Sequence, residues 1–170
     1  MRKRILVFIM LSCSLLMACG GVKGATGIGR YEYPITPEDS EWKELGSVAE
    51  KIEVCRIPKE TLEKMTEDEL VQAVLDFPFV VDLFVSSTGV PALDVFEDEC
   101  DAYKELLQRE NGKEALMEKL KELPKDDSVE TTYQADALRV LLLNTPEWKE
   151  QLTEDEISEL TSGLHSQVEQ

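Results

Sequence analysis

Apolar residues recur at intervals of three and four along most of the chain, which is the pattern of amphipathic α-helices. Prolines interrupt this pattern where one helix would end and the next begin. They are Pro37, Pro58, Pro78, Pro124 and Pro146. We therefore predict an all-α fold, a compact bundle or short superhelix of about eight short helices, in a single acidic domain over residues 37–170.

The predicted helices are joined by tight turns. They cover residues 37–45, 47–56, 58–65, 66–76, 79–86, 93–112, 113–123 and 129–144, and a last pair opens at Pro146 and closes near Gly163. The clearest is 93–112, which ends at Gly112, a residue typical of helix C-termini. Three helices carry predicted inward-facing positions. These are Val48, Ile52 and Cys55, then Leu93, Phe96, Cys100, Tyr103 and Leu107, then Val129, Tyr133, Ala137, Val140 and Leu141.

Two nearly identical phrases, TEDEL at 66–70 and TEDEI at 153–157, raise the question of a repeated site. In each, a threonine precedes a glutamate by three residues, which is the spacing of a capping box at a helix start. A tryptophan lies 24 residues before the first threonine and 5 before the second, so the copies share no period. We interpret both as helix caps, and a duplicated binding motif is the alternative.

The most apolar stretch is 74–85, and Pro78 divides it. We predict a helix that ends near Asp76, a corner, and a second helix to about Ser86, with a buried strand as the alternative. Polar and aromatic residues around this corner are candidates for a pocket. They are Phe77, Phe79, Asp76 and Asp82. Carboxylates buried in such a stretch have a raised pKa and can act as an acid or a base.

The first residues have the three parts of an export signal. Three basic residues precede an uncharged run of 13 residues from Ile5 to Met17, which is shorter than the roughly 20 that a membrane-spanning helix needs. A small residue and a cysteine complete the segment. The cleavage region is Leu16, Met17 and Ala18, and the cysteine is Cys19.

This order of residues resembles the lipobox of bacterial lipoproteins, in which the cysteine is diacylated and becomes the new N-terminus. The resemblance implies a signal peptide over residues 1–18, a diacylglyceryl anchor on Cys19, and a position on the extracytoplasmic face of the cell membrane. An ordinary secretory signal is the alternative. Five of the chain's nine glycines lie between Gly20 and Gly29, which predicts a flexible tether over residues 19–36.

Strong acidity limits the partners of the chain. The net charge is −17, and removal of the three basic residues of the leader makes it −20. Nucleic-acid sites need a basic stripe, so we expect no nucleic-acid partner. Electrostatic binding to an anionic membrane is equally disfavoured, so the lipid would hold the chain. The complementary partner is an envelope protein with a basic surface.

Residues typical of catalysis are sparse. The single histidine, His165, lies in a polar tail, and we predict no catalytic residue, metal or cofactor. Acids gather at Asp94, Glu97, Asp98, Asp101 and Glu105, and we interpret them as a solvated face, with loose Ca²⁺ binding as the alternative. Cys55 and Cys100 are either buried thiols or a disulfide. Trp42, Trp148, Tyr31 and Tyr33 either pack in the core or form an aromatic binding surface.

A phrase that starts at Trp42 resembles a family of exported helical proteins from Gram-positive anaerobes. Its positions are Trp42, Leu45, Ile57, Pro58, Leu62, Met65, Thr66, Glu69, Leu70, Val71, Val74, Leu75 and Pro78. The resemblance implies export and a helical fold, and no activity.

Three functions follow from these patterns. The leading hypothesis is a membrane-anchored, non-catalytic protein-interaction module of the cell envelope. The second is a lipoprotein that binds a small molecule or peptide and serves a transporter. A carboxylate-dependent cell-wall hydrolase is the weakest, because it needs two facing acids in a cleft.

Overall fold

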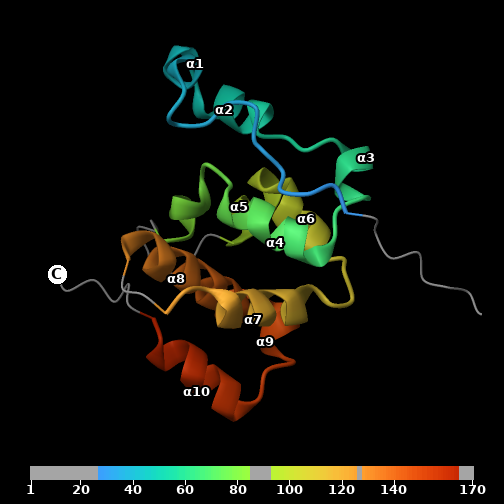
Figure 1. The fold of residues 1–170 in the computed structure, drawn as a ribbon, viewed down its shortest axis with the longest axis vertical. Helices are drawn as coiled ribbons and strands as arrows, with labels where there is room; N and C mark the ends of the chain where they lie inside the picture. The colour runs from blue at the N-terminus through green and yellow to red at the C-terminus, as the bar shows by residue number, and fades with distance from the viewer. Residues whose placement is uncertain (1–26, 85–92, 126–127, 165–170) are drawn as a thin grey trace, which may run out of the picture.

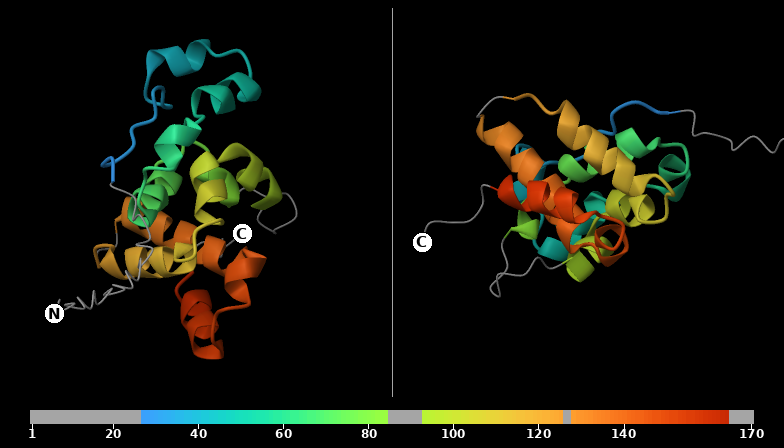
Figure 2. Two further views of the ribbon diagram at one scale, coloured as in Figure 1. Left: turned by 90° about the vertical axis from the view of Figure 1, so that its right-hand side faces the viewer. Right: turned by 90° about the horizontal axis from the view of Figure 1, so that it is seen from below.

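The computed structural model describes residues 27–84, 93–125 and 128–164. All regular structure within these ranges is helical, so the predicted all-α fold is confirmed. Helices α1 and α2 stand at one end of the longest axis and α10 at the other (Figure 1, Figure 2). The elements are α1 Ser40–Glu44, α2 Val48–Val54, α3 Lys59–Leu62, α4 Glu67–Leu75, the 3₁₀ turn η1 Val80–Leu83, α5 Leu93–Glu99, α6 Asp101–Leu106, α7 Gly112–Glu122, α8 Val129–Asn144, α9 Pro146–Lys149 and α10 Glu154–Ser162.

Helices α4 and α8 form the centre of the core. Helix α4 packs on α6 and α7, and α8 packs on α7, α9 and α10. Both helices bury most of their apolar residues, as the nearly all-round apolar pattern of α8 requires. The buried side chains of the described residues form one continuous cluster, so these helices share a single core.

A series of aromatic rings runs through this core. The ring centroids are 5.9 Å apart for Tyr33 and Phe77, 5.7 Å for Phe77 and Phe96, and 5.3 Å for Phe96 and Tyr103. Trp148 of α9 lies edge-on to Tyr103 at 5.7 Å. These tilted and edge-on arrangements are the favourable ones for aromatic pairs. The chain of rings therefore links the segment before α1 to α9.

The predicted capping boxes at the two TEDE phrases are confirmed. Thr66 and Glu69 bond reciprocally at the start of α4, and Thr153 and Glu156 do the same at α10. At α2 the device is incomplete, because the Ser47 hydroxyl accepts from the Glu50 N–H while the Glu50 carboxylate accepts from Gly46 instead. The repeated phrase is thus a repeated helix start.

The predicted helix 93–112 is wrong, because the chain bends at Cys100 and forms α5 and α6. Cys100 is fully buried in an extended conformation, with φ −102° and ψ 98°. The Asp101 carboxylate that follows it accepts from the Ile57 backbone N–H and from the Arg56 guanidinium, both at 2.9 Å. These long-range bonds to the α2–α3 connection accompany the bend.

Three further positions differ from prediction. Gly112 begins α7 rather than ending a helix, and a Cβ there would collide with the Leu106 carbonyl oxygen. Val48 and Val129, predicted to face inward, are 60% and 87% exposed. Each is the first residue of its helix, and its side chain lies outside the part of the helix that packs on the core.

The chain before α1 packs on the helices, so the tether predicted to extend to residue 36 is too long. We call residues 27–33 the N-terminal strap. The Tyr33 ring is buried and its hydroxyl donates to the Ala73 carbonyl at 2.9 Å. Arg30 donates two bonds to Asp76, each at 2.9 Å. The folded part therefore begins no later than Gly27, and residues 19–26 lie outside the described ranges.

Replacing Phe77 by alanine should destabilise the protein strongly. The ring is 1% exposed and contacts three other rings, so its loss leaves a cavity, and we expect a decrease of about 3–5 kcal/mol in the free energy of unfolding. The matched control is Phe79→Ala, because Phe79 is only half-buried. Urea unfolding followed by circular dichroism measures both, and an equal effect of the two substitutions would contradict the prediction.

Candidate functional site

The residues predicted to form a pocket at the proline corner lie in and beside the core. Phe77 is buried among the rings of Tyr33, Phe79 and Phe96. Phe79 packs at 5.5 Å on Trp42. The structure thus places packed aromatic side chains where the sequence suggested a ligand, and the apolar stretch is explained by the core.

Of the two carboxylates predicted at the pocket, the structure describes the side chain of Asp76 and not that of Asp82. Asp76, at the end of α4, accepts two bonds from Arg30 and one from Gln72 at 3.0 Å. It is therefore held in an ion pair and ties the strap to α4. Asp82 lies on η1, and its side chain is outside the described part of the structure. The lipobox positions Leu16, Met17, Ala18 and Cys19 lie outside the described residues as well.

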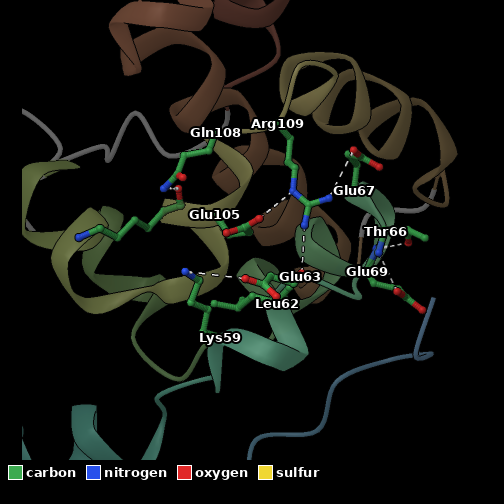
Figure 3. Close-up of polar contacts among 10 residues, drawn as sticks. Lys59, Leu62, Glu63, Thr66, Glu67, Glu69, Glu105, Gln108 and Arg109 are labelled. Carbon is green, nitrogen blue, oxygen red and sulfur yellow. Dashed lines mark hydrogen bonds and ion pairs between the residues drawn. The ribbon is translucent and has the colours of Figure 1, made fainter. Parts of the chain in front are cut away.

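Arg109 joins three segments and has a structural role (Figure 3). Its Nε donates to the Glu105 carboxylate at 2.8 Å, and its Nη2 donates to the Leu62 carbonyl at 3.0 Å. Its Nη1 lies 3.9 Å from the Glu67 carboxylate. The guanidinium uses its planar fork to hold the end of α3 and the start of α4 against the end of α6.

The tryptophans and thiols also serve packing. Trp148 is buried against Tyr103, which agrees with the predicted core role, and Trp42 contacts both the Phe79 ring and the Lys51 ammonium. Cys55 and Cys100 are buried and unbridged. Burial raises the pKa of Cys55 to about 11 and that of Cys100 to about 12. Both thiols are therefore protonated at neutral pH and are poor nucleophiles.

A groove that the sequence did not suggest lies between α7, α8 and α10. Its volume is about 420 Å³. Its apolar wall includes Met117, Leu120, Leu123 and Leu160, and its charged side chains are Lys121, Lys125, Arg139 and Glu159. We call this the α7–α8–α10 groove. Three cations against one anion reverse the sign of the chain as a whole.

Arg139 is fixed in position at this groove. Its Nη1 lies 3.3 Å from the carboxylate of Asp136, which is 3% exposed. Gly163 comes so close to the guanidinium that a Cβ there would lie 2.6 Å from Nε. The buried carboxylate therefore orients the cation, and the absence of a side chain at Gly163 leaves room for it.

The sequence carries one signal of the groove, in the position of its basic residues. Four of the fifteen basic residues that follow the leader lie between Lys113 and Lys125, in an otherwise acidic chain. Arg139 and Leu160 come from other helices, so their proximity to those lysines depends on the tertiary fold.

Comparisons with protein-family models, with curated proteins and with solved structures find no match to this chain. The family resemblance therefore stays a prediction. Among the described residues, no group of three or more metal-ligating side chains gathers around a common point. None of the described helices combines the length and apolarity needed to cross a membrane.

The Glu69 carboxylate has a second role beyond the capping box. It accepts from the backbone N–H groups of Ile28, at 2.8 Å, and Gly29 in the strap. Partial desolvation raises the pKa of Glu69, but the backbone N–H groups of Thr66, Gly29 and Ile28 lower it more, so the pKa lies below its ordinary value. Glu156, the corresponding acid of α10, caps its helix without such a partner segment among the described residues.

Substituting Glu69 should release the Ile28 and Gly29 backbone of the strap, whereas the same change at Glu156 should not. In Glu69→Ala we expect the amide resonances of Ile28 and Gly29 to move to positions typical of unstructured chain, measured by heteronuclear NMR. Glu156→Ala removes an equivalent cap and is the control. Unchanged strap resonances in Glu69→Ala would show that the carboxylate does not hold the strap.

The attachment of the strap should also depend on pH. Because the folded-state pKa of Glu69 is lowered, its stabilisation is complete above the ordinary carboxyl pKa and is lost as the pH falls through the lowered value. The Gly29 amide resonance should follow this titration in the wild type. Its failure to move at acid pH, while other carboxylates titrate, would refute the assignment.

Proposed function

We propose that the chain is a membrane-anchored extracytoplasmic lipoprotein that acts as a non-catalytic protein-interaction module of the cell envelope. The export signal and the lipobox at Cys19 support the anchor. The charge of −20 after the leader is removed supports a partner with a basic surface.

The observation that carries the interaction role is the projection of α1 and α2 from the body of the fold (Figure 2). Neither helix buries a residue. Their exposed acids include Glu41, Glu44 and Glu53, and Val48 supplies an exposed apolar side chain. A projecting pair of helices with charged and apolar groups is available to a partner without any rearrangement of the core.

The contacts of the less exposed carboxylates support a non-catalytic function. Asp76, Asp101 and Asp136 each lie beside an arginine of the same chain. Glu69 holds backbone N–H groups of the strap. These acids are occupied in maintaining the fold, and the projecting acids remain for a partner.

A second candidate function is ligand binding for a transporter, and the α7–α8–α10 groove favours it. The groove combines an apolar wall with a few polar groups, and its volume of about 420 Å³ falls within the usual size range of ligand pockets. It replaces the proline corner as the place where such a ligand would bind.

Lipid attachment can be measured directly. The intact mass of the native protein, extracted from membranes, should equal that of residues 19–170 plus a diacylglyceryl group, or more if the new amino terminus is also acylated. Cys19→Ala should keep the leader uncut. A mature protein with an unmodified cysteine would contradict the anchor.

The interaction role predicts salt-sensitive capture through α1 and α2. The native lipidated chain, isolated from envelope extract in mild detergent, should retain a basic partner at about 0.05 M salt and lose it at about 0.5 M, because salt screens exposed charges. Glu44→Gln with Glu53→Gln should weaken capture at low salt. Both acids lie at helix C-termini, so neutralising them does not weaken the helices.

Glu118→Gln with Glu122→Gln is the matched control, because it removes two exposed acids from α7. Equal loss of capture in both double variants would show that overall charge, and not the projecting helices, attracts the partner. Capture that is insensitive to salt would contradict the electrostatic role altogether.

A further inference from the structure

We propose that the α7–α8–α10 groove binds a single-chain aliphatic anion, an unbranched carboxylate with a hydrocarbon tail of medium length. The inference rests on the second candidate function and names the chemical class of its ligand. The proposed ligand is a single small molecule in solution.

The wall of the groove fits an aliphatic tail. Met117, Leu120 and Leu123 on or just after α7 face Leu160 of α10 across the groove. Binding there is favourable because these side chains and a hydrocarbon tail remove apolar surface from water together. The flexible methionine adapts to a chain whose methylene groups have no fixed shape.

The charges of the groove fit a negatively charged head. Lys121 and Lys125 are exposed, and neither lies within ion-pair distance of a described carboxylate, although Lys121 is close enough to act on the charge of Glu156. Arg139 is already oriented by Asp136, so a ligand would not bear the entropic cost of ordering it. Glu159 opposes an anion and Asp136 pairs with Arg139, but the three cations still outnumber these two carboxylates.

The groove is locally positive although the chain as a whole is negative, and this difference favours anions at the groove. A protein of net charge −20 repels anions at long range, so an anion that binds must meet a local excess of positive charge. The α7–α8–α10 groove has that excess together with an adjoining apolar wall. Its volume of about 420 Å³ lies in the lower part of the roughly 300–1,000 Å³ range of ligand pockets, which suits one hydrocarbon chain better than a two-chain lipid.

Direct titration tests the ligand class. The probe is sodium decanoate below its micelle concentration, added to the chain from residue 20 to residue 170, whose cooperative thermal unfolding is checked first. We expect saturable binding by calorimetry and shifted NMR amide resonances for Met117, Ala135 and Leu160. Decyltrimethylammonium has the same tail and the opposite charge, and acetate has the same head without the tail. Each should bind at least about tenfold more weakly than decanoate.

Charge reversal locates the head of the ligand. Lys121→Glu with Lys125→Glu should weaken decanoate binding by about tenfold or more. Lys64→Glu with Lys149→Glu makes the same change of net charge at exposed positions that do not line the groove, and should change the affinity by less than about twofold. Equal weakening by the two double variants would overturn the proposal, as would equal binding of decyltrimethylammonium.

The remaining outcomes separate this inference from the functions on which it rests. Absence of decanoate binding overturns the ligand class, while capture of a basic protein through α1 and α2 would remain as measured. Binding to phosphatidylglycerol vesicles without binding of monomeric decanoate would also overturn it, because the groove would then recognise a lipid surface. Binding of decanoate that depends on Lys121 and Lys125 supports it.

Discussion

The structure depends above all on the burial of the Phe77 ring. Pro78 disfavours a helical conformation at Phe77, so the chain turns after α4 and directs this ring into the core. There it contacts Tyr33 of the strap and Phe96 of α5, two elements that are distant in sequence. One side chain at a corner thus joins the start of the described chain, its central helix and its middle helices.

The features that could be predicted from the sequence are those that depend on residues close together along the chain. The threonine and glutamate of each capping box lie three residues apart, and both boxes form as expected because every atom they need is within one turn. The bend at Cys100 was not predictable, because no proline or glycine marks it. The bonds from Asp101 to the α2–α3 connection become available only when the chain has folded, so periodicity alone suggested one helix.

The candidate site was predicted less well than the fold, for a related reason. A run of apolar residues around Phe77 and Phe79 signals burial, and burial against neighbouring rings leaves packed core rather than a cavity. The α7–α8–α10 groove arises instead where three partly apolar helix surfaces meet incompletely. Its members Lys121, Arg139 and Leu160 belong to different helices, and no short sequence pattern relates them.

The docked strap also limits how far the domain can stand from its anchor. With Cys19 as the proposed point of attachment, only seven residues separate it from the strap at Gly27. Even a fully extended chain of that length spans no more than about 30 Å. Protonation of Glu69 would free only residues 27–29, because Arg30 keeps its bonds to Asp76 and Tyr33 stays buried. If Cys19 is the point of attachment, the domain therefore stays close to it.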